Sequence, residues 1–354
     1  MSSRMVTHRR AFLGGLAVSA LATPYFFTRA RAQDKKRLAV YTYDGALGAF
    51  AQEHYIKPFE EKFDVRVDAI TVVGAASPID KLAAQIRAGR PEVDVMWVQP
   101  PAYIYSLQND LMVPLQKGDL PEAENYIPEY VTEHGPLIHL YAYGYGVNTE
   151  MVADDLTHWR DLWDPKYRGQ LAVNDALFEQ FLAVTNLAFG KPIAEVDEET
   201  IQSLNELRPN ILSLWNTGAQ AEQLFRNREI AISPIWNGRA YNLISEGVPL
   251  KFVVPQEGFL VRHNAYGIAR GAANPDLGIE YMNYIMSEVP QTALAEQFFY
   301  GSGNKNVVHS DESLAEKVVI GHPKFQDRAL FEDFQAAFEN SGEWARLWNR
   351  WKTA

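Results

Sequence analysis

The chain has 354 residues, no cysteine and a formal net charge of −11, with 47% hydrophobic and 12% aromatic residues. The negative charge argues against nucleic acid and anionic membranes as partners, and the missing cysteine excludes disulfides, thiol catalysis and a lipid-anchoring cysteine. This composition is typical of an ordered globular protein, and two lobes are expected because a single core reaches its limit near this length.

The first 32 residues differ in composition from the rest. Arg4, Arg9 and Arg10 precede an almost uncharged, apolar run over residues 11–27, and Ala30-Arg31-Ala32 follows as a small-residue cleavage site. This order predicts a secretory signal peptide cleaved near Ala32. The apolar run is short for a membrane span, which needs about 20 residues, so no membrane insertion is expected.

Residues 7–13, Thr-His-Arg-Arg-Ala-Phe-Leu, resemble the twin-arginine (Tat) signal that exports folded proteins. The alternatives are an ordinary secretory leader with two adjacent arginines and an N-terminal helix of the fold. The leader holds five arginines and no acidic residue, so its removal leaves a net charge of about −16. We expect a free periplasmic protein.

The first third of the mature chain alternates strand and helix patterns. β-type runs over 37–43, 65–73 and 93–98 enclose helical spacing over 46–63 and 79–88. This alternation predicts a βαβ series and a parallel sheet.

Further short strands are expected at 171–173, 230–235, 251–254 and 265–268, with helices at 177–189, 219–226 and 312–352. In the last of these helices Trp344, Trp348 and Trp351 recur at helical spacing. We interpret this stripe as packing rather than function.

Motifs for catalysis and cofactors are missing. There is no Gly-x-Ser-x-Gly, no phosphate-binding loop and no dinucleotide fingerprint. His134 and His139 are too far apart to share one helical face, so no metal site is expected. No catalytic residue and no cofactor is predicted, although scattered Ser, His and Asp cannot exclude an enzyme.

Several segments, spread over most of the mature chain, resemble the family-1 solute-binding proteins of ABC importers, and the last two are similar to the spermidine/putrescine-binding branch. They are Pro58–Val67, Pro91–Trp97, Ala142–Thr149, Gly218–Phe225 and Glu229–Arg239, the last containing Trp-Asn-Gly-Arg. The resemblance implies an α/β fold of the two-lobed periplasmic binding protein type (type II), with open parallel or mixed sheets linked by a hinge. It also implies a small-molecule ligand between the lobes and a membrane permease as partner, with the protein acting as a monomer.

The lobes are expected to be discontinuous. Chain crossings near Tyr143, Asn264 and Val307 assign residues 33–142 and 264–307 to the N-terminal lobe, and residues 143–263 and 308–354 to the C-terminal lobe. Ligand binding would stabilise the closed form, which the permease recognises.

In the N-terminal lobe the resemblance places ligand contacts at the ends of the first three strands. The candidates are Tyr43 and Asp44, Gly74 and Ser77 in a Gly/Ser loop, and Gln99 and Tyr103. Each of these segments could instead be a plain turn.

In the C-terminal lobe Asn174, Asp175 and Glu179 align with positions where polyamine binders place carboxylates. The competing interpretation is a helix start capped by Asn174. Trp236 matches the aromatic residue that flanks the ligand in this family, with core burial as the alternative. Arg239 follows it and could instead form a surface or interlobe ion pair.

The second crossing departs from the family pattern. Polyamine binders have Trp-x-Asp there, whereas this chain has Arg262-His263-Asn264. The change removes the carboxylate that an ammonium group needs. Arg239, Arg262 and Asn264 suit a ligand with a carboxylate, such as an amino acid derivative, an opine or a hydroxy acid.

Three other hypotheses stay open beside this one. They are a polyamine-binding protein of the same transporter class, a Tat-exported enzyme on a similar scaffold, and a ferric-ion binder. The last would need adjacent tyrosines, and the sequence has Phe298-Phe299-Tyr300-Gly301 instead. Tyr141, Tyr143 and Tyr145 share one strand face, either as core or as a cation cage.

Overall fold

The computed structural model of the protein describes residues 36–72, 79–100, 102–309 and 311–354. The predicted leader and the candidates Gly74 and Ser77 lie outside these ranges. Within the described ranges no helix is long and apolar enough to cross a membrane.

The predicted alternation of strands and helices at the beginning of the mature chain is confirmed. The helix expected at 46–63 is continuous, but its middle turn, Ala51–Ile56, is π-helical. The elements are β1 (Arg37–Tyr43), α1 (Gly45–Phe50), α2 (Lys57–Phe63), β2 (Arg66–Val72), α3 (Ile79–Arg87), β3 (Val95–Val98), α4 (Ala102–Gln108) and β4 (Val131–Thr132).

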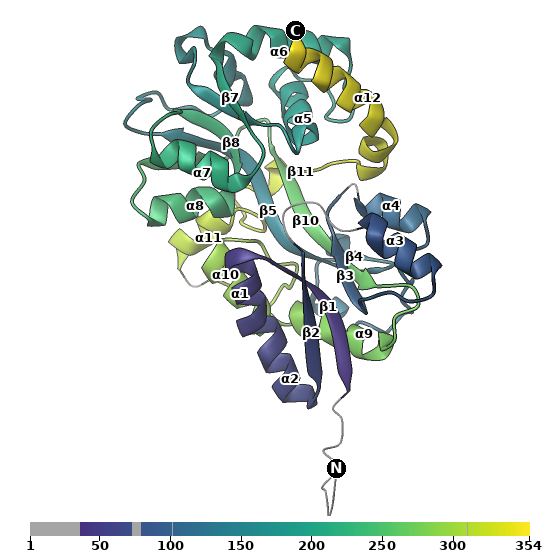
Figure 1. Cartoon of the computed structure of the whole chain (residues 1–354). Helices are drawn as coiled ribbons and strands as arrows, with labels where there is room; N and C mark the ends of the chain where they lie inside the picture. Colours follow the sequence, from purple (N-terminus) through teal and green to yellow (C-terminus); the bar gives the residue numbers. More distant parts are fainter. Residues whose placement is uncertain (1–35, 73–78, 101, 310) are drawn as a thin grey trace, which may run out of the picture. The chain divides into compact units, whose positions relative to one another are not determined.

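Two long strands connect the halves of one mixed sheet, β5 (Gly135–Asn148) and β10 (Phe259–Ile268). They pair with each other in antiparallel fashion. On one side β10 continues into the parallel strands β3, β1 and β2, and on the other β5 continues into β8, β6 and β7 (Figure 1). The two-lobed α/β fold class is thereby confirmed.

The second half-sheet repeats the pattern of strand followed by helix. Its elements are β6 (Leu171–Asn174), α5 (Phe178–Ala188), α6 (Glu198–Leu207), β7 (Ile211–Trp215), α7 (Gly218–Arg226), β8 (Ile232–Trp236), α8 (Asn237–Ser245) and β9 (Leu250–Val253). β6 is parallel to both β7 and β8. The strand predicted at 265–268 is the end of the longer β10.

The prediction of a continuous helix over 312–352 is wrong. α9 (Pro275–Met286), α10 (Glu288–Phe298) and α11 (Glu312–Val318) are followed by the short strand β11 (Ala329–Phe331), and α12 (Phe334–Thr353) comes last. Val319 ends α11 with a φ of 65° and a ψ of −60°, a backbone conformation that stops the helix. β11 then pairs in parallel with β10.

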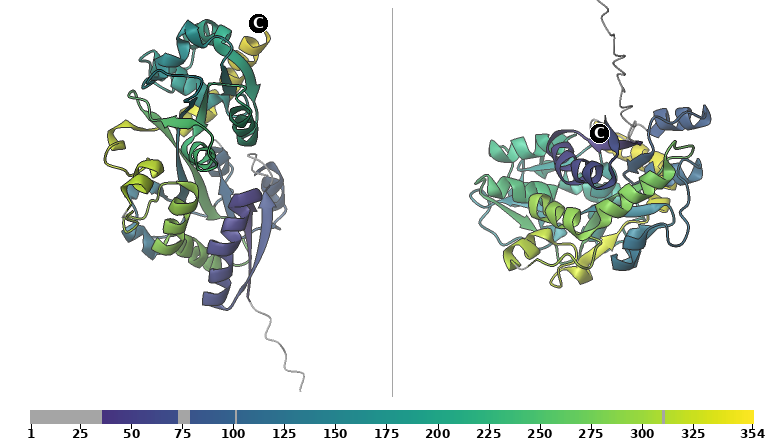
Figure 2. Two further views of the ribbon diagram at one scale, coloured as in Figure 1. Left: turned by 90° about the vertical axis from the view of Figure 1, so that its left-hand side faces the viewer. Right: turned by 90° about the horizontal axis from the view of Figure 1, so that it is seen from below.

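Packing supports these assignments. Trp344, Trp348 and Trp351 of α12 are buried, so the interpretation of this stripe as packing is confirmed. Helices α2 and α9 lie next to each other (Figure 2), with the rings of Phe59 and Tyr281 5.2 Å apart.

The buried apolar residues form two clusters, and β5 passes from one to the other between Ala142 and Tyr143. β10 contributes Leu260 to one cluster and both Phe259 and Val261 to the other. Both strands therefore pack against both cores. The lobe boundaries along the chain stay a prediction.

Candidate functional site

A β-bulge shapes the centre of the β5–β10 pair. Tyr141 lies opposite Arg262 and Ile138 opposite Asn264, so two residues of β5 face one residue of β10 between them. His139 supplies the extra residue and adopts a φ of 55°. A bulge of this kind re-aims side chains and increases the local twist. Polar side chains of both strands consequently gather at this point.

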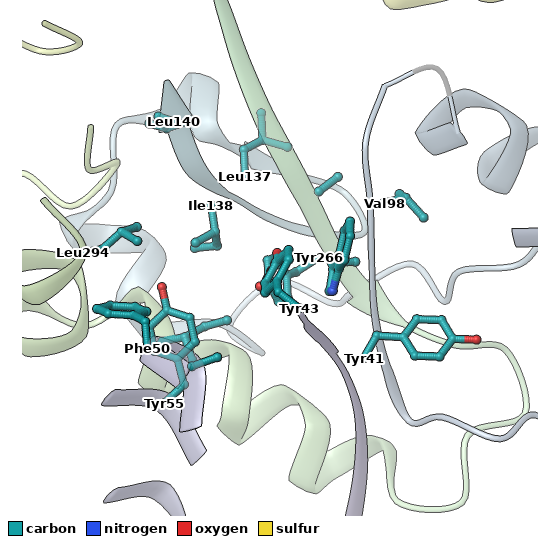
Figure 3. Packing of buried hydrophobic residues seen from close by; sticks show 14 of the residues in the cluster. Tyr41, Tyr43, Phe50, Tyr55, Val98, Leu137, Ile138, Leu140, Tyr266 and Leu294 are labelled. Atoms are coloured by element: carbon teal, nitrogen blue, oxygen red, sulfur yellow. Dashed lines mark hydrogen bonds between the residues drawn. The ribbon is translucent and has the colours of Figure 1, made fainter. Parts of the chain in front are cut away.

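The first polar group, the tyrosine–histidine cluster, consists of Tyr43, Tyr55, His139, Asn264 and Tyr266. The hydroxyl of Tyr43 lies 2.8 Å from the hydroxyl of Tyr266 and 3.0 Å from Nδ1 of His139. All five side chains are buried. Figure 3 shows Tyr43, Tyr55 and Tyr266 converging from three elements. These residues belong to segments that are far apart in the sequence.

Hydrogen bonds in this cluster define its protonation. Nδ2 of Asn264 donates to the Tyr43 hydroxyl over 3.0 Å and lies 3.3 Å from Nδ1 of His139. Nδ1 therefore accepts, and Nε2 carries the proton toward the Tyr55 hydroxyl 3.3 Å away. Burial lowers the pKa of His139 to about 3. The cluster is neutral at physiological pH.

The second polar group, the arginine cluster, consists of Arg262, Glu332, Tyr141, Glu179 and Phe334. The guanidinium of Arg262 forms an ion pair with Glu332, and both side chains are 7% exposed. The ring of Phe334 lies 5.6 Å from the guanidinium carbon.

The charges of this cluster influence one another. Burial lowers the pKa of Arg262, whereas Tyr141 and Glu179 raise it. Burial raises the pKa of Glu179, and the positive charge of Arg262 opposes that rise. Glu332 lies on the segment between β11 and α12, so its pairing with Arg262 joins two segments that cross between the halves of the sheet.

Aromatic rings connect the two clusters. Tyr300 lies 6.2 Å from His139 and 5.3 Å from Tyr141, measured between ring centroids. Tyr141 in turn meets Trp236 edge-on at 6.2 Å, and the indole N–H of Trp236 donates to Oε1 of Gln180 over 3.1 Å. The site is thus one continuous neighbourhood.

Several buried donors of this neighbourhood have no protein partner. Nε of Arg262, Nε2 of Gln180, Nδ2 of Asn174 and the hydroxyl of Tyr143 all lack a hydrogen-bond acceptor. Buried polar atoms are nearly always paired, with protein, water or a ligand. Three of these donors are N–H groups, which take an oxygen acceptor such as a carboxylate or a carbonyl. Oδ1 of Asn264 and Oε2 of Glu332 are acceptors without a hydrogen-bonded donor.

Arg239 lies beside this neighbourhood with a partner of its own. Its Nη1 donates to Oε1 of Glu222 over 2.5 Å, and its side chain is 41% exposed. The guanidinium carbon lies 5.9 Å from the ring of Trp236. Both arginines that we predicted to bind a ligand carboxylate therefore form an ion pair with a glutamate.

Asp175 faces the C-terminal helix. Its carboxylate accepts from the indole N–H of Trp348 over 2.6 Å and from Nζ of Lys352 over 2.8 Å. These contacts anchor α12 to the end of β6. The neighbouring Asn174 accepts from the backbone N–H of Leu177 through Oδ1. Because α5 begins at Phe178 with Leu177 as its N-cap residue, Asn174 lies before the helix and does not cap it.

The remaining candidates of the N-terminal lobe stand at the ends of their strands. Asp44 is exposed and its carbonyl accepts from the N–H of Gly48, while the carbonyl of the half-buried Gln99 accepts from the N–H of Tyr103. Burial raises the pKa of Tyr103, and a hydrogen bond to Thr132 opposes the rise.

Of the predicted residues, the structure brings Tyr43, Trp236, Arg262 and Asn264 into one neighbourhood, with Arg239 at its side. Sequence reasoning missed His139, Tyr266, Gln180, Glu332 and Glu222. Glu222 lies inside the matched segment 218–225, which was a usable signal. Glu332 lies 70 positions from its partner and outside every matched segment, so nothing in the sequence singled it out.

Metal ligands do not gather here. Across the described ranges no group of three or more His, Cys, Asp or Glu side chains could hold a metal ion. The neighbourhood is suited instead to an organic solute, since it combines aromatic rings, one guanidinium, carboxylates and unpaired amide donors.

Residues 54–319 match the family described as bacterial extracellular solute-binding protein, and the chain belongs to this family. It is 23% identical to the gamma-aminobutyric acid-binding protein of Pseudomonas aeruginosa, over 92% of this chain and 93% of that protein. It is 24% identical to the spermidine/putrescine-binding periplasmic protein of Salmonella typhimurium, over 68% and 69%.

Among solved structures, the fold is similar to an ABC transporter substrate-binding protein from Bradyrhizobium japonicum. The TM-score is 0.78 at 20% sequence identity, over 90% of this chain and 99% of that one. The predicted family and its solute-binding role are therefore confirmed. The relatives are transport proteins rather than enzymes, and periplasmic proteins are among them, which supports a location outside the cytoplasm.

Proposed function

We propose that the protein captures a small, polar, carboxylate-bearing solute in the periplasm and delivers it to the permease of an ABC importer. One observation carries the ligand class: the buried side chains of Arg262 and Gln180 each keep an N–H group without a hydrogen-bond partner. A carboxylate satisfies such donors, since it accepts at both oxygens. Trp236 and Tyr141 supply apolar surface for the carbon chain.

A polyamine is the second candidate, since a relative is named for spermidine and putrescine. The arrangement at β10 speaks against it. The Nδ2 group of Asn264 faces Tyr43 and His139, and two residues earlier in β10 Arg262 holds a buried guanidinium. A diamine would bring positive charge close to Arg262. The carboxylate of Glu332 would not balance it, because Glu332 already pairs with Arg262.

Delivery to a permease would follow from lobe closure around the ligand. β5 and β10 are the strands on which the lobes would turn, and α4 contacts α12 across the two halves of the sheet. We propose that the protein acts as a monomer with residues 1–32 removed, exported through the twin-arginine route. It needs neither a cofactor nor catalytic residues for this task.

Thermal unfolding in the presence of a ligand panel tests the proposal. A bound ligand at 100 times its dissociation constant adds about 2.7 kcal/mol to the stability of the folded state. We expect amino acid derivatives, opines or hydroxy acids to raise the melting temperature, and putrescine and spermidine to leave it unchanged. The proposal would be refuted if no ligand of the panel raised the melting temperature and mass spectrometry detected no copurifying small molecule.

Arg262→Ala is the site-directed arm of this test. We expect it to abolish the melting shift caused by a carboxylate ligand, because the buried guanidinium is lost. Arg239→Ala should weaken binding less, because Arg239 is partly exposed and paired with Glu222. Unchanged carboxylate affinity in both variants would show that the proposed ligand class is wrong.

A further inference from the structure

The arginine cluster does not carry the excess positive charge that its sequence suggested. Arg262 is the cation of the cluster, and Glu332 pairs with its guanidinium while Glu179 lies close enough to affect its ionisation. Arg239 has Glu222 beside it. A carboxylate with no other charge would therefore meet a site whose positive charge is already balanced.

The free hydrogen-bonding capacity is distributed unevenly around Arg262. Its Nη1 side faces Glu332, whereas its Nε–H is unpartnered. The amide Nε2 of Gln180 is also unpartnered and 1% of Gln180 is exposed. The unpartnered donors suit a ligand carboxylate, and the carboxylates of Glu332 and Glu179 suit a ligand ammonium group.

We propose that Glu332 is a specificity-determining residue that restricts the ligand to a carboxylate which also bears an amino group. This inference rests on the proposed function and narrows its ligand class. Glu332 balances Arg262, so that a zwitterion leaves the charge of the site unchanged. A plain carboxylate adds an uncompensated negative charge next to Glu332, and a diamine adds positive charge next to Arg262.

Three four-carbon probes separate these cases, because they differ only in their end groups: 4-aminobutyrate, butyrate and putrescine. Calorimetric titration of the full mature protein should give 4-aminobutyrate at least a tenfold advantage over each of the other two. In Glu332→Gln the site gains a net positive charge. The advantage of 4-aminobutyrate over butyrate should then fall at least tenfold.

The matched control is Glu246→Gln, which makes the same change in an exposed Arg–Glu pair, 2.8 Å from Nε of Arg226. It should bind the probes as the wild type does. Glu332→Asp keeps the charge and should keep the order of the probes.

If Glu332→Gln does not fold, the double variant Arg262→Gln with Glu332→Gln replaces it, because it leaves no unpaired buried charge. We expect it to bind 4-aminobutyrate at least tenfold more weakly than the wild type.

An unchanged ratio of 4-aminobutyrate to butyrate in folded Glu332→Gln, or wild-type affinities in the double variant, would overturn the inference. Equal binding of butyrate and 4-aminobutyrate by the wild type, or binding of none of the three probes, would overturn it as well. These results would leave the proposed function standing. It is refuted only if, in addition, no ligand of the wider panel raises the melting temperature and no small molecule copurifies.

Discussion

The two polar clusters at the crossing strands are equally buried but differ in charge. The tyrosine–histidine cluster is neutral, and its hydroxyls and imidazole form hydrogen bonds with one another, while Oδ1 of Asn264 has no partner. The arginine cluster holds an ion pair with 7% of each side chain exposed, and Nε of Arg262 lacks a partner. The comparison teaches that neighbouring polar groups can serve different ends: a neutral network holds strands together, whereas a charged one can recognise a ligand.

The largest effect is expected from Arg262→Met. It leaves Glu332 buried without its counter-ion, which typically costs about 3–5 kcal/mol. Urea unfolding followed by circular dichroism measures the loss. Arg239→Ala, in the half-exposed pair with Glu222, should cost less than about 1 kcal/mol. Similar losses in the two variants would refute the contrast between the buried and exposed arginines.

Acid should weaken the tyrosine–histidine cluster through His139, and the surroundings of the arginine cluster through His263, whose ring lies 5.1 Å from that of Phe334. Burial lowers the pKa of His139 to about 3, and burial with the charge of Arg262 lowers that of His263 to about 3. The unfolded chain binds protons below its ordinary pKa of about 6.5 while the folded chain does not, so stability falls as pH drops from about 6.5 toward 3. Each histidine should cost about 2 kcal/mol at pH 5.

His139→Gln and His263→Gln separate the two contributions. Each substitution should flatten the dependence of stability on pH between 6.5 and 4 by the share of one proton, even where it lowers stability at pH 7. Urea unfolding at a series of pH values measures the slope. A slope that neither variant changes would mean that other groups account for the acid sensitivity.

Tyr43→Phe tests the role of the neutral tyrosine–histidine cluster. It removes a hydroxyl that contacts Tyr266, His139 and Asn264, and should cost about 1–2 kcal/mol. The preference among the three four-carbon probes should stay as in the wild type. A changed preference would place the Tyr43 hydroxyl in contact with the charged part of the ligand, and the two clusters would then act as one.

The smallest effect apart from that of Arg239→Ala is expected from Asp175→Asn. It weakens the contacts with Trp348 and Lys352, and should cost about 1 kcal/mol because the carboxylate and the ammonium are partly exposed. Increased hydrogen exchange at the end of α12 would locate the loss, with ligand affinity unchanged. A clear loss of affinity without a loss of stability would favour the ligand-binding role that the polyamine binders suggest.

Much of the architecture could be predicted from local patterns. The alternating strands and helices before residue 100 follow from apolar periodicity and turn residues, which act within about ten positions of the chain. The break between α11 and α12 could not be predicted in this way. It depends on β11 pairing with β10, about 70 residues away, and on a positive φ at Val319 that the preference of a β-branched residue disfavours.

The residues of the candidate site likewise fall into those that the sequence predicted and those that it did not. Motif resemblance identified Trp236 and Arg239, and the departure from the family pattern drew attention to Arg262 and Asn264. The partners of these residues could not be predicted, since Glu332, Gln180 and His139 belong to no motif. Asp175 is a candidate ligand carboxylate by resemblance, and only the structure reveals its contacts with Lys352 and Trp348.

By itself the sequence determined the class of protein, the strand–helix order and the residue types that line the centre of the sheet, because these depend on composition and short-range spacing. Only the tertiary structure decided which charges neutralise each other. Ion pairs such as Arg262–Glu332 form between segments far apart in the chain, and burial decides how strongly they act. The charge that a ligand meets is therefore a property of the folded site, and the arginines alone do not reveal it.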